Sequence, residues 1–144
     1  MSAINEWFGY YNALFTYIRD TYGEEELEEY FSHLAREAYS DVTPVYRDGG
    51  LEAIADRYLR NFKKDGDESS AEAEIREEVL TMAIRCPAYT HGVEVKHPAR
   101  RVGDFFCQCC QRLNRKILSE AGYELSVERG EGCYCEWNIK KQDG

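Results

Sequence analysis

The sequence lacks both a long apolar run and an excess of basic residues. Its apolar segments end well short of the roughly 18 consecutive residues that a membrane-spanning helix requires, and no charged-then-apolar leader follows Met1. We therefore expect a cytoplasmic protein that binds no membrane. Asp and Glu number 27 against 18 Lys and Arg, which gives a formal net charge of −9. Because this charge opposes binding to a phosphate backbone, we also expect no nucleic-acid partner.

The common catalytic motifs are missing too. The chain contains no glycine-rich phosphate loop, no Gly-x-Ser-x-Gly and no His-Glu-x-x-His. Cysteine is abundant instead, since five of the six cysteines lie between Val102 and Trp137. In a reducing cytoplasm such cysteines are thiols, metal ligands or catalytic groups, so we expect no native disulfide.

Helical periodicity dominates the first half of the chain. Apolar residues recur at helical spacing in three segments, from Ile4 to Tyr22, from Leu27 to Ala38 and from Leu51 to Phe62. A turn at Asp48–Gly50 is expected just before the third segment. The many aromatic residues of these segments have the spacing of core residues, so we assign them no role in a site.

The second half combines one long helix with strands. Alternating apolar residues predict a strand at Val79–Cys86 and a hairpin formed by Tyr123–Glu128 and Cys133–Lys140. Residues 71–78 are rich in Ala and Glu and are equally compatible with helix. Between the strands, Val102–Ala121 has the pattern of an amphipathic helix.

Together these segments predict an α+β fold in a single domain, 1–144. A helical N-terminal half of about 1–64 and a loop at 64–70 precede a cysteine-bearing half of about 71–144. We expect the helical half to pack on a small antiparallel sheet together with the long cysteine-bearing helix. The first helix and the cysteine helix are expected to cover one face of that sheet.

The cysteine helix places its thiols at different depths. At about 100° per residue, Cys109 falls on the apolar face, whereas Cys107, Cys110 and Asn114 follow the boundary between the buried and wet faces. A half-buried boundary suits a reactive thiol. If Cys86 and the cysteine at 135 end up on neighbouring strands, four thiols converge beside this helix.

Three interpretations of these thiols remain open. In the first, the helix N-terminus or a nearby His91 or His97 lowers the pKa of one thiol, which becomes a nucleophile. In the second, Cys107-x-x-Cys110 joins Cys86 and Cys135 in a closed zinc or iron–sulfur site, although a second close pair is missing from the sequence. In the third, the cysteines pack as small apolar residues.

Three short stretches resemble the L-2-amino-thiazoline-4-carboxylate hydrolase family over roughly Val79–Ile139. They are Arg85-Cys86-Pro87, Phe106-Cys107-Gln108-Cys109-Cys110 and Gly132-Cys133-Tyr134-Cys135-Glu136-Trp137. The helix motif of that family is usually Cys followed three residues later by Asp, and here Cys110 takes the place of the acid. A looser likeness links the chain to vinyl-reductase-type small-ligand-binding domains. Both resemblances imply a pocket beside the cysteine helix.

Our first hypothesis is therefore a small-molecule hydrolase, without a cofactor, that opens a C–N or C–S bond. Cys107 would be its nucleophile, His91 a base and Cys110 a further catalytic residue. The residues expected to bind the substrate are Cys86, Tyr89, Asn114, Cys135 and Glu136. The alternative, which Cys110 favours, is a non-catalytic, sensor-like domain that binds a small ligand, or zinc or iron, through Cys86, Cys107, Cys110 and Cys135.

Overall fold

The computed structural model describes residues 3–86, 103–131 and 134–143, and it confirms the α+β class. The helices are α1 (Ala3–Tyr22), α2 (Glu24–His33), the π-helical turn η1 (Leu34–Ala38), α3 (Val42–Asp65) and α5 (Asp104–Glu120). The strands are β1 (Ala71–Arg76), β2 (Val79–Arg85), β3 (Tyr123–Arg129) and β4 (Tyr134–Lys141). None of the described helices is long and apolar enough to cross a membrane.

The four strands form one antiparallel sheet in the order β1-β2-β4-β3. Residues 71–78, which the sequence leaves open to helix, form β1 and the turn into β2. Pairing across β2 and β4 sets Met82 opposite Trp137 and Ile84 opposite Cys135. Since side chains alternate along a strand, this register places all four on the same face, which is buried.

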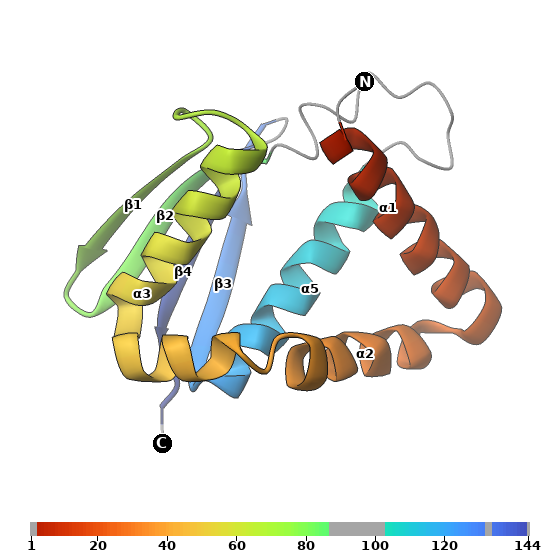
Figure 1. Ribbon diagram of the computed structural model, residues 1–144, viewed down its shortest axis with the longest axis horizontal. Helices are drawn as coiled ribbons and strands as arrows, with labels where there is room; N and C mark the ends of the chain where they lie inside the picture. The colour runs from red at the N-terminus through yellow and green to blue at the C-terminus, as the bar shows by residue number, and fades with distance from the viewer. Residues whose placement is uncertain (1–2, 87–102, 132–133, 144) are drawn as a thin grey trace.

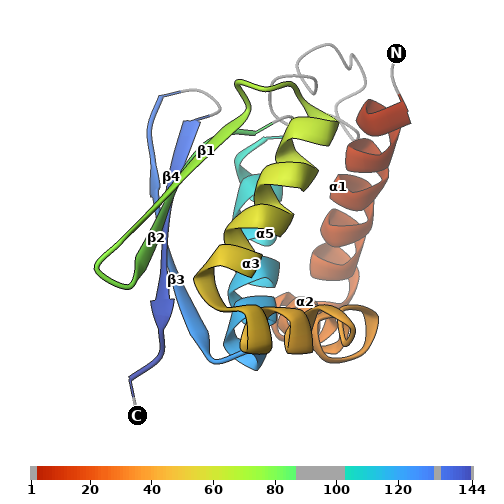
Figure 2. The ribbon, with the colours of Figure 1, turned by 60° about the vertical axis from the view of Figure 1, so that its left-hand side comes forward.

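Helices α3 and α5 cover the buried face of the sheet, and α1 lies in a further layer beyond α5 (Figures 1 and 2). Helix α3 packs against β1 and β2, and α5 packs against β3. The expectation that the first helix covers the sheet is wrong, because α1 contacts α2 and α5 instead. Trp7 and Leu14 on α1 are correspondingly exposed to solvent.

The segment between α1 and the sheet turns at glycines. Gly23 ends α1 with a φ of 98°, and Gly50 has a φ of 70°, a left-handed conformation that favours glycine. The expected turn at Asp48–Gly50 is thus a kink within α3. Its position lets the second part of α3 lie along the sheet while the first part crosses below α5 (Figure 1).

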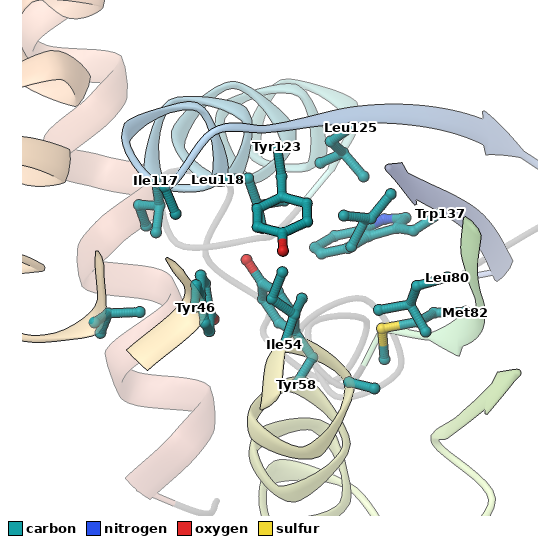
Figure 3. Close-up of a cluster of buried hydrophobic side chains, with 14 of the residues drawn as sticks. Tyr46, Ile54, Tyr58, Leu80, Met82, Ile117, Leu118, Tyr123, Leu125 and Trp137 are labelled. Carbon is teal, nitrogen blue, oxygen red and sulfur yellow. The ribbon is translucent and has the colours of Figure 1, made fainter. Parts of the chain in front are cut away.

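The core has two parts. The larger lies between the sheet, α3 and α5, where side chains such as Tyr46, Tyr58 and Trp137 point toward one another (Figure 3). The smaller is an aromatic cluster between α1, α2 and α5 that contains Phe15, Leu27, Phe31, Phe106 and Cys109. Cys109 is fully buried there, so its predicted core role is confirmed.

Candidate functional site

Four cysteines converge on one small cavity between the sheet and the start of α5. Cys107 and Cys110 come from α5, Cys86 follows β2 and Cys135 lies on β4. The predicted convergence of these four thiols is therefore confirmed. The cavity measures about 30 Å³, and its other walls come from Phe62, Ile84, Phe106, Gln111 and Trp137. It is therefore much smaller than a heterocyclic substrate.

Burial disfavours the thiolate form of the two cavity cysteines on α5. The pKa of Cys107 is raised from 9.0 to about 11, chiefly by burial and in smaller part by Cys86 and Cys135, while Arg129 opposes the shift. Burial and the three neighbouring thiols likewise raise the pKa of Cys110. The predicted half-buried position of Cys107 is wrong, because this residue is only 8% exposed. Desolvation of the thiolate is the largest cause of the raised pKa of Cys107.

Several other expected site residues do not lie at the cysteine cavity of the described structure. Tyr89 and His91, and also His97, lie outside the described residues, so the structure places no candidate base. Glu136 follows Cys135 on β4 and therefore points to the opposite face of the sheet. Its predicted role beside the thiols is not supported, since the pleat separates the carboxylate from the cavity.

Metal binding was the other use expected for this cluster. Among the described residues, no group of three or more His, Cys, Asp or Glu is arranged so that it could hold a metal ion. Cys107, Cys109 and Cys110 carry free thiols. The convergence of the four cysteines thus gives a shared cavity without the close geometry of a tetrathiolate site.

Asn114 joins the thiols to a second pocket. Its amide nitrogen donates to the Cys110 carbonyl oxygen at 2.8 Å and lies 3.5 Å from the Cys110 sulfur. Its amide oxygen accepts a hydrogen bond of 2.7 Å from the Tyr58 hydroxyl. Asn114 therefore contacts Cys110 at the edge of the cysteine cavity and itself lines a neighbouring pocket of about 150 Å³ between α3 and α5.

We call this second space the tyrosine pocket, lined by Tyr39, Val42, Tyr46, Arg57, Tyr58, Asn61, Leu113, Asn114 and Ile117. Sequence reasoning identified Asn114 but missed the tyrosines, which have the helical spacing of ordinary core residues. A sequence signal was nevertheless present. Three tyrosines and an arginine within one amphipathic stretch bring more polar atoms than a core can easily satisfy.

Comparison with known proteins assigns the chain to no family. No protein-family model matches the chain, and no curated protein matches it significantly. The geometry of the cysteine cavity and of the tyrosine pocket therefore carries the functional argument.

Proposed function

We propose that this chain is a small-ligand-binding domain of a sensor-like type, which recognises its ligand beside α5 and does not turn it over. The supporting observation is that four thiols converge on a small cavity where burial raises the pKa of Cys107. Covalent catalysis by cysteine needs a thiolate. Thiols with a raised pKa are better suited to lining a binding site than to attacking a substrate.

The connection through Asn114 supports the same proposal. Cys110 borders the cysteine cavity, and its hydrogen-bond partner Asn114 also binds Tyr58 in the tyrosine pocket. A ligand that moves Tyr58 or Asn114 would thereby change the surroundings of Cys110. Such a link between a binding pocket and oxidisable or metal-reactive thiols is what a sensor requires.

A hydrolase is the second candidate, and one observation favours it. Cys86 lines the cavity, and Tyr89 and His91 follow it in the sequence by three and five residues. In that mechanism Cys107 would be the nucleophile and His91 would accept its proton. Ligand binding would have to reverse the raised pKa of Cys107.

Two measurements on protein purified anaerobically separate these functions. The first is product analysis by mass spectrometry after incubation with 2-amino-thiazoline-4-carboxylate, for which we expect no turnover. Turnover that disappears in both Cys107→Ser and His91→Ala would overturn the binding proposal and establish the hydrolase.

The second measurement is native mass spectrometry combined with metal analysis. We expect a small molecule to be retained by the wild type and lost from Asn114→Ala, with Ser126→Ala on the exposed face of β3 as the matched control. Stoichiometric zinc or iron that is lost from Cys110→Ser would instead support the metal-binding alternative.

A further inference from the structure

The tyrosine pocket contains a buried polar atom that its surroundings do not satisfy. The Tyr46 side chain is fully buried, and its hydroxyl has no hydrogen-bond partner among the described residues. Burial raises the pKa of Tyr46, while the nearby Tyr58 hydroxyl and Arg57 guanidinium lower it without reaching hydrogen-bond geometry. Buried hydroxyls are normally paired, because an unpaired one loses its hydrogen bonds to water. A group placed in the pocket would restore the missing bond.

Arg57 is the positively charged residue in the described lining of the tyrosine pocket. It interacts electrostatically with Tyr39, Tyr46 and Tyr58. No carboxylate belongs to the described lining, and the ion pairs recorded for described residues of α3 use Arg60 and Lys63 rather than Arg57. The guanidinium is therefore available to an anion that enters from the rim of the pocket.

Besides the polar side chains of Asn61 and Asn114, the tyrosine pocket has apolar walls. Val42 and Ile117 are buried, and Leu113 is half-buried beside them. The lining thus combines hydroxyl and guanidinium donors with branched aliphatic side chains. Its volume of about 150 Å³ corresponds to roughly five liquid water molecules at about 30 Å³ each. It suits a small molecule with an anionic head and a short apolar tail.

We propose that the tyrosine pocket binds a short-chain aliphatic carboxylate, held at its carboxylate by Arg57 and the Tyr46 hydroxyl and at its alkyl chain by Val42, Leu113 and Ile117. This inference rests on the proposed function, because it names the chemical class of the ligand. A planar carboxylate matches the fork of a guanidinium and leaves an oxygen for a phenol. Inorganic phosphate has no alkyl chain to pack against the aliphatic side chains of the pocket, so we expect it to bind less tightly than a carboxylate.

The position of Asn114 gives this ligand an effect on the thiols. Tyr58 donates to Asn114, which in turn holds Cys110. A carboxylate that competes for the Tyr58 hydroxyl would loosen Asn114 and expose the Cys110 sulfur. Binding in the tyrosine pocket is thus expected to accelerate thiol labelling at Cys110.

The test is an NMR titration of the full ¹⁵N-labelled chain with butanoate, and with butanamide as its uncharged match of the same shape. We expect amide signals around Tyr46, Arg57 and Asn114 to shift with butanoate, and affinity for butanamide to be at least about tenfold weaker, since a charge-assisted hydrogen bond is lost. Inorganic phosphate is expected to compete poorly. Mass spectrometry of iodoacetamide-treated protein follows Cys110 in the same samples.

Two variants assign the binding to the pocket. Tyr46→Phe removes a hydroxyl that has no partner, so the fold should keep or gain thermal stability while butanoate affinity falls about tenfold. Arg57→Gln should lose butanoate binding. Arg60→Gln on the same helix and Tyr17→Phe on α1 are the matched controls, because both residues are exposed and lie outside the pocket, and they should bind as the wild type does.

Equal affinity for butanoate and butanamide, equally tight binding of phosphate, or an absence of shifts near the pocket would overturn the carboxylate assignment and leave a hydrated pocket. Unchanged affinity in Arg57→Gln would overturn it as well. These outcomes differ from failure of the proposed function, which thiol-dependent turnover would show. A different small molecule retained in the native mass spectrum would preserve the binding function and remove only the carboxylate class.

Discussion

The two faces of α5 are held by different kinds of contact. Toward the sheet and α3, the helix borders the larger core, in which strand pairing fixes the register of the buried side chains. Toward α1 and α2, it borders a small aromatic cluster and a set of ion pairs, where Arg112 binds Glu24 and Glu28 and Lys116 binds Glu28. The sheet face also borders both the cysteine cavity and the tyrosine pocket.

This difference shows where stability and binding reside. A face whose neighbours are fixed by a sheet can maintain small cavities and a partly satisfied polar pocket, because the surrounding backbone does not collapse into them. The helical face has no such frame, so it depends on aromatic packing and on charges that salt can screen. We therefore expect substitutions on the two faces to change the free energy of unfolding by different amounts. We also expect these changes to depend differently on salt and pH.

The two tryptophans of the chain give the largest expected contrast. Trp137 is buried, with its ring 5.2 Å from that of Tyr58 and 5.8 Å from that of Phe62, whereas Trp7 on α1 is 57% exposed. Trp137→Ala should lower the free energy of unfolding by about 3–5 kcal/mol, and Trp7→Ala by about 0.5 kcal/mol or less. Urea denaturation followed by circular dichroism measures both. Similar losses would mean that the outer face of α1 is covered in solution.

The next contrast concerns the thiols, since Cys107 lies on the cavity side of α5 and Cys109 on the helical side. Burial raises the pKa of each to about 11. A shift of two units from 9.0 leaves roughly 100-fold less thiolate at neutral pH. We expect slow iodoacetamide labelling of both residues, with rates that rise about tenfold per pH unit up to pH 10. Rapid labelling of Cys107 alone at neutral pH would restore its assignment as a nucleophile.

The same shift predicts a loss of stability in alkali. A thiol whose pKa is raised by folding stabilises the native state fully below the pKa of the unfolded chain, near 9.0, and this contribution disappears as pH rises through about 11. The urea midpoint should therefore fall between these two pH values. Cys107→Ala should show a shallower fall than the wild type, and an unchanged slope would contradict the raised pKa.

Asn114 tests the polar link on the sheet side. Asn114→Ala leaves the buried Tyr58 hydroxyl without its acceptor, so we expect a loss of about 2 kcal/mol in the free energy of unfolding. The double variant with Tyr58→Phe should be less destabilised than the sum of the two single variants, because the unsatisfied hydroxyl is then absent. Strictly additive losses in urea denaturation would indicate that the two side chains act independently.

Arg112 tests the ionic link on the helical side. Arg112→Gln should cost about 1 kcal/mol at low ionic strength and less in high salt, because the side chains of this network are partly exposed. Burial raises the pKa of Glu28, but hydrogen bonds from Arg112 and Lys116 outweigh it and hold that pKa below 4.5. This stabilisation is present above the pKa of the unfolded chain and disappears as pH falls through the lower native pKa.

Asn114→Ala provides the comparison for Arg112→Gln. High salt should reduce the loss of unfolding free energy caused by Arg112→Gln and leave the loss caused by Asn114→Ala unchanged. Arg36→Gln serves as a control, because its pair with Glu29 is exposed and should contribute little. Equal salt dependence of the Asn114 and Arg112 variants would contradict the distinction between the two faces.

The smallest expected effect is a gain of stability at the edge of the sheet. The turn from β1 to β2 places Glu77 and Glu78 at positive φ, 51° and 64°, which is the conformation of a tight hairpin turn that prefers Asn-Gly. Glu78→Gly should raise the free energy of unfolding by about 0.5–1 kcal/mol. Glu78→Ala keeps the Cβ atom and removes only the charge, so it should bring little gain in the same denaturation assay.

Local periodicity was sufficient for several elements. The apolar spacing from Ile4 to Tyr22 predicted α1, and the alternation after Gly122 predicted the β3–β4 hairpin with Cys135 on it. These features follow from the sequence because helix and strand periods depend on neighbouring residues alone. The convergence of four cysteines followed from the same elements once a helix was expected to cross the sheet.

The sequence by itself therefore determined the α+β class, most of the elements and which cysteines meet. Tertiary structure alone decided that α3 rather than α1 covers the sheet beside α5, that Cys107 is buried, and that the buried Tyr46 hydroxyl has no hydrogen-bond partner among the described residues. The physical reason is that periodicity assigns a side chain to a face, whereas its burial, pKa and hydrogen bonds depend on which distant segments pack against that face.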